Sequence, residues 1–114
     1  MLYPWAFEPQ SADPVLALCR GLAEAYAEGT GVNGTPYDTG TGRDHYGPGI
    51  GVGGELCDWV LVELAGTCLA LTIELSPASA NPGFILPSSA IKSVVDQNWN
   101  GLLKLLQVFE FERS

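Results

Sequence analysis

Positive charge is scarce in this chain: five lysines and arginines stand against thirteen aspartates and glutamates, giving a net charge of −8. Nucleic acids and anionic membranes are bound through basic patches, so we expect neither as a partner. No apolar run approaches the roughly 18 residues of a membrane-spanning helix. The chain also lacks a G-x-S-x-G segment and a phosphate-binding loop with lysine, which argues against serine hydrolase and nucleotide-binding chemistry.

Cysteine is also sparse, with Cys19, Cys57 and Cys68 in no C-x-x-C pair. This spacing indicates neither a metal site nor a redox site, and we interpret the three residues as small core residues. A Cys57–Cys68 disulfide is the alternative if the chain is secreted. The first residues lack the basic and apolar regions of a signal peptide, so either the protein is cytosolic or its N-terminus has been removed. The compartment stays undecided.

Apolar residues, by contrast, are abundant. Hydrophobic residues make up 46% of the 114 residues and the mean hydropathy is +0.16, which excludes a disordered chain. The length suits a single domain over residues 1–114. Helical periodicity predicts helices at about 14–28 and 88–110. A strand is predicted at 68–75, and a long loop at 29–54.

The predicted fold class is therefore α/β, with a small mixed sheet flanked by the two helices. We expect the last helix to bury a stripe of large apolar residues against the sheet: Val95, Trp99, Leu102 and Leu106. Replacing Trp99 by alanine should then cost several kcal/mol. Gly101 interrupts this helix at a cost of roughly 1 kcal/mol relative to alanine. Such a glycine predicts the close approach of another element.

One acid, Glu74, interrupts the apolar strand. An ionised carboxylate is rarely buried without a partner or a function. From the residues alone, a carboxylate that ends a strand and pairs with a buried base is a better interpretation than a catalytic one.

Five motifs occur in an order that covers nearly the whole chain: Tyr3-Pro4, Gly53-Gly54 with Asp58-Trp59, Thr72-x-Glu74-Leu75, Gly83-Phe84-x-Leu86-Pro87, and Trp99 in the last helix. Together they resemble the C-terminal part of the zinc metallocarboxypeptidases of the carboxypeptidase A/B type. The resemblance implies hydrolysis of C-terminal residues from peptides. It also implies that Glu74 is the general base that takes a proton from a zinc-bound water.

The same resemblance implies substrate-binding residues. A mobile tyrosine that covers the substrate corresponds to Tyr46 or, with a larger insertion, to Tyr37. Ala6, Cys57 and Thr72 correspond to the pocket for the C-terminal side chain and favour a neutral or apolar substrate.

Zinc is implied for the full-length family domain, but its ligands would precede Met1. We therefore predict no metal ligands and no zinc in this chain alone, which we expect to be inactive, because the lone His45 cannot supply the three ligands of a catalytic zinc. The arginine that clamps the substrate carboxylate would also precede Met1, and Arg43 is a weak substitute. The chain is thus interpreted as the C-terminal half of a peptidase domain, completed by an N-terminal half or a second copy. The alternatives are a non-catalytic module that binds peptide C-termini, and an interaction protein that uses an open sheet edge.

Overall fold

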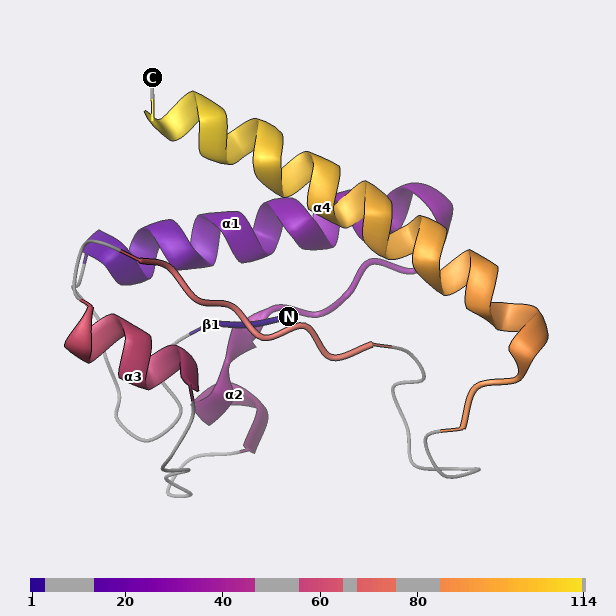
Figure 1. Ribbon diagram of the computed structural model, residues 1–114, viewed down its shortest axis with the longest axis horizontal. Helices are drawn as coiled ribbons and strands as arrows, with labels where there is room; N and C mark the ends of the chain where they lie inside the picture. Colours follow the sequence, from indigo (N-terminus) through magenta and orange to yellow (C-terminus); the bar gives the residue numbers. More distant parts are fainter. Residues whose placement is uncertain (4–13, 47–55, 65–67, 76–84, 114) are drawn as a thin grey trace.

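The computed structural model describes residues 1–3, 14–46, 56–64, 68–75 and 85–113, which are mostly helical (Figure 1). The elements follow in this order: β1 (Leu2–Tyr3), α1 (Pro14–Thr30), the 3-10 helix η1 (Gly31–Asn33), β2 (Gly40–Thr41), α2 (Gly42–Tyr46), α3 (Leu56–Glu63), the 3-10 helix η2 (Ser88–Ala90) and α4 (Ile91–Arg113). In this part of the chain, no helix is both long and apolar enough to cross a membrane.

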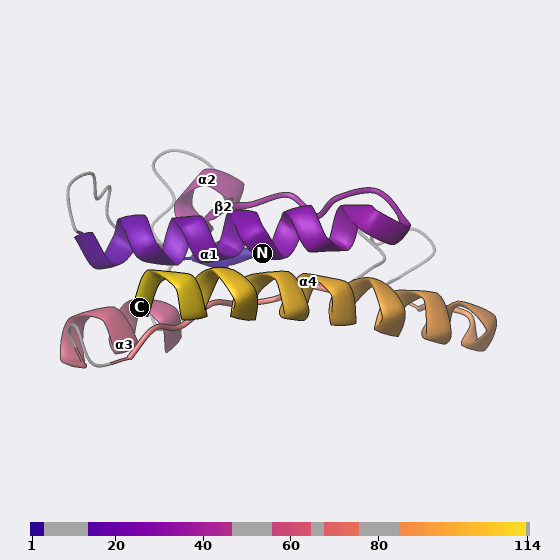
Figure 2. The same cartoon turned by 90° about the horizontal axis from the view of Figure 1, so that it is seen from above.

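The two long helices, α1 and α4, lie against each other (Figure 2). Their contact is closest at two glycines. A Cβ added to Gly101 would lie 2.9 Å from Cγ2 of Thr30 and 2.9 Å from Cε1 of Tyr26, and one added to Gly29 would lie 2.7 Å from Cα of Gly101. These distances are shorter than carbon atoms adopt, so a side chain at either glycine would force its neighbours to shift. The close approach predicted from Gly101 is confirmed.

The predicted α/β fold with a small mixed sheet is wrong. In the described residues, strand pairing is limited to a two-residue parallel pair, in which Leu2 faces Gly40 and Tyr3 faces Thr41, and to an isolated antiparallel bridge between Leu2 and Thr72. The strand expected over 68–75 is therefore a single bridge, with N–H···O distances of 2.7 and 2.9 Å. Apolar residues make a strand only where another strand is present to pair with it, and here the pairing stops at Thr72.

The core lies between α1 and the short strands. Its centre is formed by Met1, Ala23 and Tyr26, and Leu71 and Leu105 pack against it from outside. The side chains of Cys19, Tyr26 and Thr30 are almost completely buried. All three belong to α1, so this helix supplies most of the buried surface.

The expectation that α4 buries its large apolar stripe is also wrong. The exposed fractions are 59% for Val95, 57% for Trp99, 38% for Leu102 and 45% for Leu106. The helix meets α1 through a different face, at Gly101. Periodicity locates an apolar face correctly but does not show what covers it, and the described chain leaves this one partly exposed.

The segment expected as a loop over 29–54 contains β2 and α2. A reciprocal pair of hydrogen bonds begins α2: the Thr41 backbone N–H donates to Oδ2 of Asp44 (2.9 Å), and the Asp44 backbone N–H donates to Oγ1 of Thr41 (3.0 Å). This is the capping-box arrangement of a helix N-terminus.

Candidate functional site

Three of the predicted site residues lie on α3 and the extended segment 68–75. The buried thiol of Cys57, on α3, is 3.1 Å from Oγ1 of Thr72. Neighbouring side chains of an extended segment point to opposite sides, so Thr72 and Glu74 share one side and Ile73 and Leu75 the other. One face therefore presents a thiol, a hydroxyl and a carboxylate, and the opposite face is apolar.

Glu74 is exposed and lies within electrostatic reach of the Met1 amino group. That amino group donates a hydrogen bond to the backbone carbonyl of Asp38 at 2.7 Å. Burial lowers the pKa of the Met1 amino group, and the negative charges of Glu74 and Asp38 partly oppose this shift. The exposed Glu74 carboxylate is thus open to a reactant, as a proton acceptor must be.

Tyr37 is held in place by neighbours. Its hydroxyl accepts a hydrogen bond from Nδ2 of Asn98 at 2.9 Å, and its ring lies 6.4 Å from that of Tyr26. Its backbone N–H donates to Oγ1 of Thr30 at 3.0 Å. A tyrosine with these contacts would have to break them before it could cover a substrate.

Two other predicted site residues are less defined. Tyr46 is the last residue of α2, and its side chain is not among the described parts of the structure. Ala6 lies outside the described residues. The predicted site is therefore brought together in part: Cys57 and Thr72 touch, and Glu74 shares a face with Thr72.

Sequence reasoning missed Asn98 as an organising residue. Its Oδ1 accepts a hydrogen bond from the Tyr26 hydroxyl, while its Nδ2 donates to Tyr37 and to the Val94 carbonyl. Burial, and to a smaller degree the nearby Tyr37, raises the pKa of Tyr26. The signal was present, because an asparagine on an otherwise apolar helical stripe indicates a buried hydrogen-bond network.

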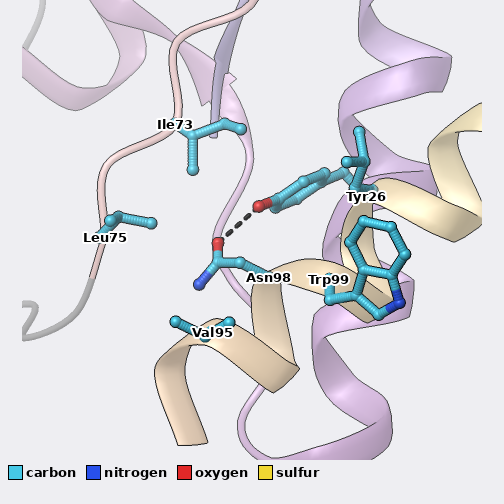
Figure 3. Close-up of a pocket in the computed structure, with 7 residues that line it drawn as sticks. Tyr26, Ile73, Leu75, Val95, Asn98 and Trp99 are labelled. Atoms are coloured by element: carbon cyan, nitrogen blue, oxygen red, sulfur yellow. Dashed lines mark hydrogen bonds between the residues drawn. The ribbon is translucent and has the colours of Figure 1, made fainter. Parts of the chain in front are cut away.

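Beside this network is an apolar cleft of about 420 Å³ (Figure 3). It lies between α4 and the apolar face of the segment 68–75, with Tyr26 and Asn98 in its wall. The full lining is Tyr26, Ile73, Leu75, Val95, Asn98, Trp99 and Leu102. In Figure 3 the side chains of Ile73 and Leu75 point toward these α1 and α4 residues.

The described residues do not assemble a zinc site. Within the described ranges, no group of three or more histidine, cysteine, aspartate or glutamate residues could hold a metal ion. His45 is an exposed residue of α2. Its neighbour Asp44 caps that helix through hydrogen bonds with the Thr41 backbone and side chain. These bonds also lower the pKa of Asp44. The donor groups present therefore do not fit a catalytic zinc, which needs three protein ligands.

Comparison with known proteins gives the family. The model of the zinc carboxypeptidase family matches residues 1–101, which is most of the chain. The chain therefore belongs to the zinc carboxypeptidase family, and the resemblance found in its motifs is confirmed. No solved structure matches the chain.

Proposed function

We propose that this chain supplies the catalytic carboxylate and part of the substrate pocket of a zinc carboxypeptidase domain. Glu74 is the general base of peptide-bond hydrolysis at a substrate C-terminus, and Thr72 and Cys57 line the pocket for the C-terminal side chain. Ala6, Tyr37 and Tyr46 are the remaining substrate-binding candidates. The zinc ligands belong to the N-terminal half of such a domain, and residues 1–114 alone are inactive.

The observation that carries this proposal is the shared face of Thr72 and Glu74. The Thr72 hydroxyl is fixed on one side by the bridge from its backbone to Leu2 and on the other by contact with the Cys57 thiol. Glu74 stands two residues further along the same face and is exposed. A carboxylate that takes up a proton needs this combination of a positioned backbone and an accessible side chain.

The pocket chemistry supports a neutral or apolar substrate side chain. The groups that Cys57 and Thr72 present are a thiol and a hydroxyl, neither of which carries the negative charge that would attract a basic side chain. Glu74 is excluded from that role because the proposal assigns it to proton transfer.

The experiment measures zinc content and hydrolysis of a peptide with a C-terminal phenylalanine. The chain is assayed alone and after coexpression with the N-terminal half of a zinc carboxypeptidase domain that carries the zinc-binding residues. We expect no turnover by the chain alone and turnover by the coexpressed pair. Glu74→Gln should reduce the pair's turnover by at least about a hundredfold, because general-base catalysis contributes about 10²–10⁴-fold.

Glu63→Gln is the matched control, since Glu63 is an exposed glutamate at the end of α3. It should leave turnover unchanged. Turnover that survives Glu74→Gln would refute the assignment of the base. Zinc-dependent turnover by residues 1–114 alone would refute the need for an N-terminal half. Saturable binding of the peptide without turnover in any combination would favour the alternative, a module that holds peptide C-termini.

A further inference from the structure

Among the described residues, the segment 68–75 has one paired edge and one edge without a backbone partner. Both the N–H and the C=O of Thr72 bond to Leu2. In an extended chain the backbone groups of the adjoining residues point the other way, so those of Leu71 and Ile73 point away from β1. By the same alternation those of Leu75 do so as well. The structure gives none of these three residues a backbone hydrogen bond within the described part of the chain.

The open edge is next to the apolar cleft. Ile73 and Leu75 point into that cleft (Figure 3), and they are 42% and 58% exposed. Val95 and Trp99 of α4 form the opposite wall and are more than half exposed. A strand added beside Ile73 would therefore find backbone partners along the edge and an apolar surface for every second side chain.

We propose that this edge and cleft bind an extended segment of another polypeptide by strand addition. The segment has apolar residues at alternate positions and is neutral or basic overall. This inference rests on the proposed function and deepens it, because it names the surface on which a completing polypeptide docks. The main-chain hydrogen bonds supply affinity, and the cleft selects apolar side chains.

Charge decides against a second copy as the occupant. Each chain carries a net charge of −8, so a dimer of two copies would carry a net charge of −16. Two lysines of α4 are already paired with acids, Lys92 with Asp96 and Lys104 with Glu28. Self-association would thus add repulsion with little to offset it, whereas a neutral or basic segment avoids this cost.

The probe is a synthetic peptide of alternating valine and threonine with a lysine at each end. Its affinity is measured by isothermal titration calorimetry, and the exchange rates of the Ile73 and Leu75 amide protons are followed by NMR. We expect saturable binding and slower exchange at both amides. A peptide of the same sequence, N-methylated at the amides of one edge, should bind at least about tenfold more weakly, because each missing hydrogen bond costs about 0.5–1.5 kcal/mol.

Two variants test whether the peptide binds at the cleft or at any exposed apolar residue of α4. Val95→Ser replaces an apolar residue of the cleft wall that is 59% exposed. Ile91→Ser replaces an apolar residue of the same helix that is 55% exposed and is not among the cleft-lining residues. Val95→Ser should weaken peptide binding about fivefold, as expected for loss of a largely buried valine contact. Ile91→Ser should leave binding unchanged. Because both positions are exposed in the free protein, neither change should unfold it.

Three results would overturn the inference. Equal binding of the N-methylated peptide would show that the main chain is not recognised. Equal effects of Val95→Ser and Ile91→Ser would place binding outside the cleft. A concentration-dependent dimer in sedimentation equilibrium, dissociated by Val95→Ser, would make a second copy the occupant. None of these measurements involves zinc or hydrolysis, so their failure is distinguishable from a failure of the role proposed for Glu74.

Discussion

Replacing Gly29 by alanine should destabilise the protein, although alanine is the better helix former. A Cβ at this position would lie 2.7 Å from Cα of Gly101 and 2.8 Å from the carbonyl carbon of Asn100. Both are backbone atoms of α4, which cannot rotate away as a side chain can. The helices would have to separate, and overpacking of this kind costs about 1–3 kcal/mol.

The magnitude follows from two opposing effects. Replacement of a helical glycine by alanine gains up to about 1 kcal/mol. The clash at Gly29 should lie at the upper end of its range because both neighbours are backbone. We therefore expect Gly29→Ala to lower the free energy of unfolding by about 2 kcal/mol, which for a domain of this size lowers Tm by roughly 8 °C.

Gly21→Ala is the matched control. Gly21 lies in the same helix, α1, and a Cβ there would meet no atom within 4 Å. It should raise the free energy of unfolding by about 0.5–1 kcal/mol. The assay is urea denaturation followed by far-ultraviolet circular dichroism. If Gly29→Ala is as stable as Gly21→Ala, α1 and α4 do not cross at Gly29 and the described packing is wrong.

Three other substitutions test the same framework by urea denaturation. Asn98→Ala should cost about 1–3 kcal/mol, because it removes the hydrogen-bond partner of both Tyr26 and Tyr37; a neutral result would contradict the network. Thr30→Val should also cost about 1–3 kcal/mol, since it keeps the volume of a completely buried side chain but leaves the Tyr37 amide without its acceptor; unchanged stability would mean that another acceptor replaces it. Trp99→Ala should cost less than about 1 kcal/mol, because Trp99 is 57% exposed; a loss of several kcal/mol would show that its indole is buried in solution.

The helices could be predicted from the sequence because their signals are local. Apolar spacing placed the first helix at 14–28 and the last at 88–110, and the structure has α1 at Pro14–Thr30 and α4 at Ile91–Arg113. Gly29, the first residue after the predicted helix, instead lies inside α1 at the crossing with α4. A local pattern cannot distinguish a glycine that ends a helix from one that admits a neighbouring helix.

The sheet could not be predicted because pairing is a property of two segments. The run from Cys68 to Leu75 has strand-like composition, yet only Thr72 is bridged. α2 was missed for a different reason: the spacing of Thr41 and Asp44 is a local helix-start signal, and the surrounding glycines concealed it.

In the candidate site, too, local features could be predicted from the sequence and long-range contacts could not. Glu74 and Thr72 could be named as candidates because they match a short family motif, and their positions on one face follow from strand alternation. The fixed position of Tyr37 was not foreseen. It depends on Asn98, 61 residues away, and a contact over that separation leaves no local trace in the sequence.

The crossing of α1 and α4 also bears on how the chain is synthesised. Tyr26 and Asn98, which bond across it, are separated by 72 residues, so α1 is made long before the helix it packs against. Until then the face of α1 that meets α4 is uncovered, and closing so long a loop carries an entropic cost before this contact is gained. The nascent chain therefore passes through a long aggregation-prone stage, and we expect its yield of soluble protein to depend on chaperones that hold apolar segments.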